Sequence, residues 1–173
     1  MWNRNEISKI FVIVVLGISF MHSIWRDETR AGETQFALIV RGEEGRETRL
    51  SLSEIGKLPR FSVRAKDEKG KESVWEGVPL HELLKGAGVK LGEAIRDRTL
   101  ANYLVAEAAD GYRVVFTLPE IDPTFTDLTF LLAYRRDGQP LGVYEGNLRI
   151  VVPHEKRHAR WIRQIVTLSI RRS

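Results

Sequence analysis

The sequence contains no cysteine among its 173 residues. This absence excludes thiol catalysis, disulfide scaffolds, and zinc or iron–sulfur sites that depend on cysteine ligands. The content of 14 glycines and 6 prolines is ordinary and excludes collagen-like and low-complexity chains. The sequence also lacks a G-x-S-x-G motif, a P-loop and a G-x-G-x-x-G motif. The familiar signatures of α/β-hydrolases and nucleotide-binding enzymes are therefore missing.

The N-terminus carries the pattern of an export signal. Arg4 and Lys9 precede Ile10–Phe20, which is an apolar run of eleven residues without a charge. A membrane-spanning helix needs about 20 apolar residues, and the run reaches that length only if Met21–Trp25 is included. No A-x-A cleavage site follows, so residues 1–25 are predicted to be either a signal peptide or a retained membrane anchor. The predicted location is exported, periplasmic or extracytoplasmic.

The rest of the chain has the length of one domain. Residues 26–34 are polar and are predicted to be a flexible lead-in. Residues 35–173 contain no internal repeat and no Ser/Gly-rich linker, and they are numerous enough to bury a hydrophobic core. We therefore expect a single domain over residues 35–173.

Two short helices have recognisable start signals. Ser51 and Glu54 have the spacing of a capping box, which predicts a short helix within Leu50–Leu58. Pro79 is tolerated at the start of a helix because the amide there has no partner within the helix. The residues after it form one apolar stripe at helical spacing: Leu80, Leu83, Leu84 and Ala87.

Alternating patterns and turn residues indicate strands. Phe61–Lys66 reads as a half-buried strand, and in Gln164–Arg171 the apolar residues Val166, Leu168 and Ile170 alternate with polar ones. Asp110-Gly111 and Asp137-Gly138 predict tight turns next to apolar runs. The sum is an α+β domain that is β-rich, with mixed sheets, about seven to nine short strands and three or four short helices. Regular βαβ spacing is missing, which disfavours a doubly wound parallel sheet.

The segment His154–His158 matches the zinc-protease pattern H-E-x-x-H. Such a site requires both histidines on one helix face and a third ligand. Residues 159–173 contain no His, Asp or Glu, and Lys156, Arg157 and Arg160 would repel a dication. We therefore predict a solvated basic turn and no metal site.

Positive charge is concentrated near the C-terminus. Asn147–Ser173 holds seven basic residues against a single acid, Glu155. Such asymmetry is typical either of an anion site, for phosphate, a pterin pyrophosphate or a lipid headgroup, or of a solvated face. Aromatic residues do not interleave with these basic residues as they do in nucleic-acid-binding proteins, so no nucleic-acid partner is expected.

Several segments, taken in order, resemble the oxidoreductase molybdopterin-binding domain, the fold of sulfite oxidases and bacterial periplasmic methionine-sulfoxide reductases. The resemblance extends over roughly Leu50–Ile170. It implies a sulfite-oxidase-like fold and molybdopterin as a cofactor. The matching segments are S-V-W-E-G-V-P-L-H-E-L-L-K-G-A-G-V (Ser73–Val89), A-D-G-Y (Ala109–Tyr112), D-G-Q-P-L (Asp137–Leu141), N-L-R-I-V-V-P (Asn147–Pro153) and R-W-I-R-Q-I (Arg160–Ile165).

The family's chemistry depends on a cysteine thiolate that ligates molybdenum on the strand before the W-x-G-V-P-L motif. Alignment on Trp75 puts this position at or next to Ala65, which cannot ligate a metal. The resemblance also implies that Arg64 and the segment His154–Arg163 face the pterin's pyrophosphate. The expected cofactor-binding residues are Arg64, His154, Lys156, Arg157, His158 and Arg160.

Three functions stay open on the sequence alone. The first is an exported pterin- or anion-binding accessory module without the cysteine-ligated oxo-transfer site. The second is a molybdopterin-dependent oxidoreductase whose metal is ligated in an atypical way. The third is an adaptor, tethered to the membrane through its N-terminus, whose basic face meets anionic lipid or an acidic partner.

Overall fold

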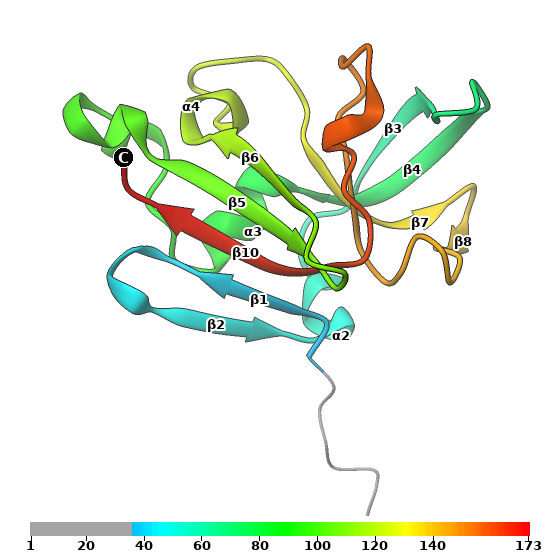
Figure 1. Cartoon of the computed structure of the whole chain (residues 1–173), viewed down its shortest axis with the longest axis horizontal. Helices are drawn as coiled ribbons and strands as arrows, with labels where there is room; N and C mark the ends of the chain where they lie inside the picture. The colour runs from blue at the N-terminus through cyan, green and yellow to red at the C-terminus, as the bar shows by residue number, and fades with distance from the viewer. Residues whose placement is uncertain (1–35) are drawn as a thin grey trace, which may run out of the picture. The chain divides into compact units, whose positions relative to one another are not determined.

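The computed structural model describes residues 36–173, which form two β-sheets with short helices (Figure 1). The first sheet has the strand order β2-β1-β10-β5-β6. Its strands are β1 (Leu38–Arg41), β2 (Glu47–Leu50), β5 (Tyr103–Ala108), β6 (Arg113–Thr117) and β10 (Ile165–Arg171). β1 and β10 run parallel, and the other neighbouring strands of this sheet are antiparallel.

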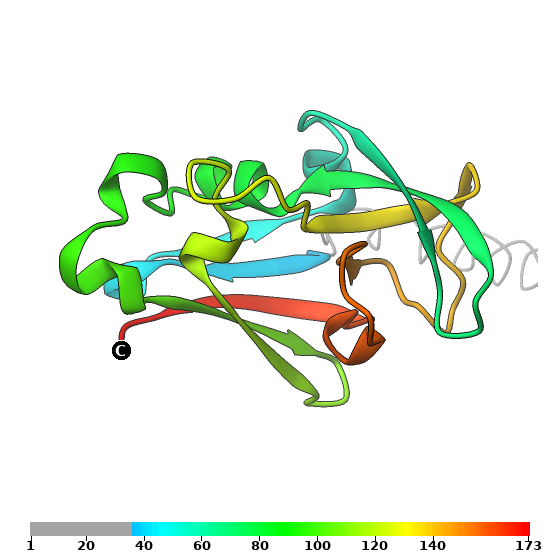
Figure 2. The same ribbon diagram turned by 90° about the horizontal axis from the view of Figure 1, so that it is seen from above.

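The second sheet has the order β3-β4-β7-β8, and β9 also pairs with β7. Its strands are β3 (Phe61–Lys66), β4 (Glu72–Pro79), β7 (Leu131–Arg136), β8 (Gln139–Pro140) and β9 (Arg149–Val151). The α-helices are α2 (Leu52–Ile55), α3 (Leu80–Gly86) and α4 (Leu118–Ile121), and 3₁₀ helices cover Glu43–Gly45, Gly92–Ala94, Asp97–Ala101 and His158–Arg160. Figure 2 shows α3 on one face of the first sheet. This arrangement confirms the predicted β-rich α+β class with mixed sheets.

Local sequence explains where the helices start. The hydroxyl of Ser51 accepts a hydrogen bond from the backbone N–H of Glu54, whose carboxylate accepts one from the backbone N–H of Ser51. This confirms the predicted capping box of α2. Thr117 and Glu120 form the same box at the start of α4, which the sequence analysis missed. Pro79 directly precedes α3, and the predicted apolar stripe of α3 is buried in the core.

Both Asp-Gly turns are present. Asp137 and Gly138 have φ angles of 51° and 77°, and they join β7 to β8 in the two-residue loop that favours positive φ at both positions. Gly111 has a φ of 84° in the turn between β5 and β6. The carboxylate of Asp110 accepts a hydrogen bond from the backbone N–H of Tyr112 and thereby fixes this second turn.

The expected alternation in β10 is wrong. Val166 is exposed, whereas Thr167 and Ser169 are buried together with Leu168 and Ile170. β10 is the central strand, and Thr167 and Ser169 lie between longer side chains of β1 and β5, which shield their outer face. The pairing with β5 also shifts register between Ile165 and Thr167, which interrupts a simple period of two residues.

The strand Phe61–Lys66 is present as predicted, but its pattern of burial is only partly alternating. Ala65 is buried and Val63 is half-buried, whereas Phe61 is 49% exposed. β3 is the edge strand of the second sheet, so neighbouring side chains cover Phe61 from one side only.

The predictions for residues 1–25 and 26–34 lie outside the described residues. Over residues 36–173, no helix is long and apolar enough to cross a membrane. The expected domain over residues 35–173 is described from Phe36 onward.

Candidate anion-binding cleft

A cleft of about 660 Å³ lies between the turn of the β5–β6 hairpin and the segment 156–163. Figures 1 and 2 both show this segment, drawn in orange to red, next to the hairpin. The hydroxyl of Tyr112 in the turn donates a hydrogen bond to the carbonyl of Ala159, which joins the two walls at 2.9 Å. The charged residues that line the cleft are the basic Arg149, Lys156, Arg157 and Arg163 and the acidic Glu68 and Asp110.

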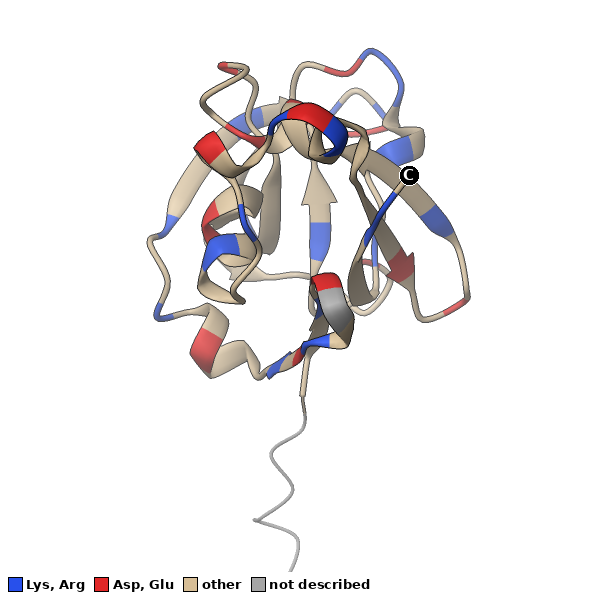
Figure 3. Ribbon diagram, turned by 90° about the vertical axis from the view of Figure 1, so that its left-hand side faces the viewer, with Lys and Arg blue, Asp and Glu red and all other residues tan. Residues whose placement is uncertain are grey.

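The excess of positive charge in the cleft is local. On the face of the protein seen in Figure 3, basic and acidic segments are interspersed rather than gathered by sign. Lys156 and Arg157 are both exposed, and within residues 36–173 neither side chain makes an ion pair or a hydrogen bond. Two unpaired cations at the rim favour a ligand with negative charge.

The segment that carries these cations is anchored by Trp161. This residue is buried, and its indole N–H donates to the carbonyl of Val152 at 3.0 Å. The backbone N–H of Ile150 donates to the carbonyl of Ile162 at 2.8 Å, which fixes the segment to β9. The chain between Val152 and Trp161 therefore loops outward from a fixed base and presents Lys156 and Arg157 to solvent.

Arg149 lies at the inner end of the cleft, where it is only 3% exposed. Its guanidinium stacks on two indole rings, 5.1 Å from the centroid of Trp75 and 5.7 Å from that of Trp161. Nη1 donates to Glu145 at 2.9 Å and Nη2 donates to Glu68 at 3.2 Å. Nε is buried and, within the described part of the chain, has no hydrogen-bond partner. A buried donor without a partner is rare in folded proteins, so this nitrogen is a candidate donor for a ligand.

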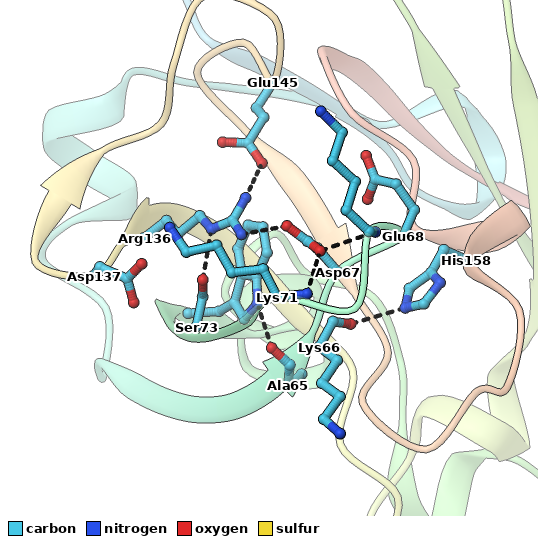
Figure 4. A network of polar contacts seen from close by, with 12 residues as sticks. Ala65, Lys66, Asp67, Glu68, Lys71, Ser73, Arg136, Asp137, Glu145 and His158 are labelled. Carbon is cyan, nitrogen blue, oxygen red and sulfur yellow. Dashed lines mark hydrogen bonds and ion pairs between the residues drawn. The ribbon is translucent and has the colours of Figure 1, made fainter.

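A second arginine, Arg136, lies on the same indole ring, 4.6 Å from the centroid of Trp75. Its Nε donates to the hydroxyl of Ser73, and its two η nitrogens contact Asp67 and Glu145 (Figure 4). Every nitrogen of this guanidinium therefore has a partner. The resulting network joins β4, β7 and the β3–β4 turn, and it meets the cleft at Glu145, whose carboxylate Arg136 and Arg149 share.

Asp67 is the buried anion of this network. Burial alone would raise the pKa of the Asp67 carboxyl. Hydrogen bonds from Arg136 and from the backbone N–H groups of Lys71 and Lys69 outweigh burial and hold the pKa below its usual value. Asp67 is therefore ionised at neutral pH and fixes the β3–β4 turn.

The structure brings three of the predicted site residues together in the cleft: Lys156, Arg157 and His158. His158 Nε2 lies 2.9 Å from the carbonyl oxygen of Lys66, so the imidazole connects the basic segment to the end of β3. The ring also packs edge-on against Trp161 at 4.4 Å.

The other three predicted residues do not line the cleft. Arg160 is held by Glu120 and Glu155, and its guanidinium lies over the ring of Phe116. Arg64 projects from the edge strand β3, where its exposed side chain lies 3.8 Å from Glu72.

His154 packs against the ring of Phe130 and does not line the cleft. Because the segment 152–160 forms turns and a 3₁₀ helix, His154 and His158 do not share one face of an α-helix. The geometry that the H-E-x-x-H pattern requires is therefore not present.

Arg149, Tyr112 and Tyr144 line the cleft but were not among the predicted site residues, and Arg163 was predicted only as the end of the segment His154–Arg163. Arg163 lies over the ring of Tyr144 at 3.9 Å, and both line the cleft with Tyr112. One signal was available for Arg149, because it stands in the run L-R-I-V-V, where a charged residue interrupts a strand that otherwise reads as buried. A charge in such a place needs partners, and the partners here come from distant parts of the sequence.

The position that the family resemblance assigns to the metal-ligating cysteine is buried in β3. The carbonyl of Ala65 accepts a hydrogen bond from the indole N–H of Trp75 at 3.4 Å. The complete sequence offers no thiolate. The donors of the cleft, including the unpartnered Arg149 Nε, fit the anionic part of molybdopterin, but the chain has no residue that fits a cysteine-ligated molybdenum.

Comparison with solved structures identifies the sulfane dehydrogenase SoxCD from Paracoccus pantotrophus, at 20% identity and a TM-score of 0.61. The match covers 79% of this chain and 38% of that chain, so this chain spans well under half of that chain's length. The likeness shows the fold alone, and the expected sulfite-oxidase-like fold is confirmed. No curated protein matches the chain. The family model of the oxidoreductase molybdopterin binding domain matches residues 63–172, and the chain therefore belongs to this family.

Proposed function

We propose that the chain is a pterin- or anion-binding accessory module that holds a phosphate-bearing ligand in the cleft and performs no oxo transfer at a cysteine-ligated metal. The observation that carries this proposal is Arg149, a buried arginine at the inner end of a basic cleft whose Nε has no hydrogen-bond partner among residues 36–173. Guanidinium groups bind phosphate through paired, charge-assisted hydrogen bonds. Lys156 and Arg157 add positive charge at the entrance.

The cleft is also suited to a planar ring attached to the anion. Tyr112 and Tyr144 line it and are both largely exposed, and although Arg163 covers one face of Tyr144, the rest of both rings is available for contact with a flat heterocycle. The volume of about 660 Å³ lies in the usual range for small-molecule and cofactor sites, which is about 300–1,000 Å³. A pterin with a phosphate group meets both requirements.

The test is to purify the full chain in detergent from a host that synthesises molybdopterin, and to measure bound pterin and metal. The proposal predicts bound pterin in the unmodified protein and a loss of at least about tenfold in affinity for the double variant Lys156→Gln/Arg157→Gln. The matched control is Lys57→Gln/Arg98→Gln, which removes the same charge from exposed residues outside the cleft and should leave binding unchanged.

The same preparation distinguishes the alternative functions. Stoichiometric molybdenum in the purified protein would favour an oxidoreductase with atypical metal ligation. If neither pterin nor a phosphate compound binds, and the protein instead floats with anionic vesicles at low salt only, the membrane-tethered adaptor is favoured.

We also propose that residues 1–25 direct the chain to an extracytoplasmic compartment. A fusion of residues 1–34 to a reporter that is active only outside the cytoplasm should then give activity. Replacing Val14 by Arg should abolish it, because a charge at the centre of an inserted apolar segment costs about 2.5–3.5 kcal/mol. Equal activity of the two fusions would contradict the proposal.

A further inference from the structure

The two carboxylates that contact Arg149 differ in their surroundings. The side chain of Glu145 is 13% exposed and is shared with Arg136, whereas that of Glu68 is 41% exposed and, within residues 36–173, forms an ion pair with Arg149 only. A hydrogen bond from its own backbone N–H and the charge of Arg149 keep the pKa of Glu68 below its usual value, so Glu68 is an anion at neutral pH. Of the two carboxylates, Glu68 is the one that solvent and a ligand can reach.

The β3–β4 turn does not depend on the contact between Glu68 and Arg149. Asp67, the preceding residue, fixes the turn through the backbone N–H groups of Lys69 and Lys71 and through Arg136. The Glu68 side chain can therefore leave Arg149 and enter solvent while the turn keeps its shape. Because its side chain is 41% exposed, Glu68 is hydrated when it leaves, and Arg149 keeps its ion pair with Glu145.

Glu68 accepts a hydrogen bond from only one of the two adjacent donors on this edge of the Arg149 guanidinium. In an arginine the N–H of Nε and one N–H of Nη2 point in parallel, and together they match a pair of oxygens on one phosphate or carboxylate. Glu68 accepts only from Nη2, and Nε has no partner within residues 36–173. An anion that replaced Glu68 could accept from both donors and satisfy the buried Nε.

We propose that Glu68 is an internal competitor for Arg149, and that the ligand of the cleft carries a phosphate monoester group that displaces it. This inference rests on the proposed function and specifies the group that the cleft recognises. A side chain tethered so closely competes at an effective concentration in the millimolar range or above. A free monocarboxylate has the same charge as Glu68 and gains little, whereas a phosphate dianion gains a second charge and attraction from Lys156 and Arg157.

The experiment compares Glu68→Gln with Asp110→Asn in the full chain in detergent, using inorganic phosphate near pH 8 as the calorimetric probe. Both substitutions remove one negative charge from the cleft, but Asp110 caps the hairpin turn and does not contact Arg149. Glu68→Gln should tighten phosphate binding by at least about tenfold, whereas Asp110→Asn should change it by less than about threefold. Acetate should bind to the unmodified protein more weakly than phosphate does.

Two further measurements make the outcome decisive. Glu68→Asp keeps the charge but shortens the side chain, so its affinity should lie between those of the unmodified protein and Glu68→Gln. The ¹H–¹⁵N resonance of Arg149 Nε should shift on addition of phosphate, which a general change in charge would not require. Glycerol 3-phosphate and guanosine monophosphate then distinguish a phosphate on a headgroup-like fragment from one on a planar heterocycle.

The two proposals fail in different ways. If the unmodified protein binds phosphate and Glu68→Gln binds no more tightly than Asp110→Asn, Glu68 is not a competitor and the proposed function stands. If phosphate binds to Glu68→Gln alone, the competition is strong and the inference is supported. If no form of the protein binds any of the phosphate probes, both proposals are wrong.

Discussion

Arg136 and Arg149 lie over the same ring, Trp75, and share the carboxylate of Glu145, yet their surroundings differ. Arg136 has a protein partner for each of its three nitrogens. Arg149 is more deeply buried and nevertheless keeps Nε without a partner in the described part of the chain. The comparison teaches that burial of a charge does not by itself identify a binding residue. The feature that sets Arg149 apart is the Nε donor that residues 36–173 leave without a partner.

The largest expected effect is on stability, and it comes from replacing Arg136, whose nitrogens all have partners. Arg136→Gln should lower the free energy of unfolding by about 3–5 kcal/mol, because it leaves the buried carboxylate of Asp67 without its cation. Urea denaturation of the full chain in detergent measures this change. Arg135→Gln, the neighbouring arginine on the same strand, is the control and should change stability by about 0.5 kcal/mol or less.

Arg149→Gln should have a smaller effect on stability and a larger one on binding. We expect a loss of about 1–2 kcal/mol in unfolding free energy. The loss is small because Glu145 retains its ion pair with Arg136, and Glu68 is exposed enough for water to hydrate its carboxylate. Phosphate affinity should fall by at least about tenfold, which equals about 1.4 kcal/mol. Equal stability losses for the two arginine variants would contradict the distinction between them.

Acid should lower the free energy of unfolding through Asp67, the carboxylate that pairs with Arg136. The folded-state pKa of this carboxyl lies below the unfolded value of about 3.9, so the stabilisation is fully present above that pH. It is lost as the pH falls through the folded-state pKa, because the unfolded chain then binds the proton first. Unfolding free energies measured from about pH 5 down to about pH 2 should fall less steeply in Asp67→Asn than in the unmodified protein. Parallel curves would show that Asp67 does not contribute this linkage.

The smallest effect is expected at the rim of the cleft. Arg157→Gln should leave the unfolding free energy within about 0.5 kcal/mol, since the side chain is exposed and makes no ion pair within residues 36–173. It should weaken phosphate binding by about two- to fivefold at low salt and by less at high salt, because exposed charges are screened. A calorimetric series in increasing salt measures both. A loss that does not depend on salt would place Arg157 deeper in the site than the structure does.

Features set by neighbours in the sequence were predictable, and those set by distant neighbours were not. The Ser51–Glu54 capping box and the Asp137-Gly138 turn depend on residues within one turn of chain, and both are present. The shielding of Thr167 and Ser169 depends on β1 and β5, so an alternating pattern could not reveal it.

The candidate site shows the same division. The family resemblance, together with the local excess of positive charge, selected Lys156, Arg157 and His158, and these three line the cleft. The same reasoning selected Arg160, whose partner Glu120 stands 40 residues away in the sequence and holds it outside the cleft. The role of Arg149 likewise depends on Glu68 and Trp75, which belong to other strands and turns and become neighbours only in the folded protein.

The parallel pairing of β1 with β10 has a consequence for how the chain folds. β10 is the central strand of the first sheet, and it follows all the other strands in the sequence. During synthesis β1 and β5 are therefore made before β10, the strand that pairs with both of them. Such pairing between segments far apart in the sequence slows folding. A chain that stops before Ile165 would expose the edges of β1 and β5 that pair with β10. Unpaired strand edges can pair with other chains and lead to aggregation. The β1–β2 and β5–β6 pairs do not need β10, but the first sheet is complete only when residues 165–171 have joined them.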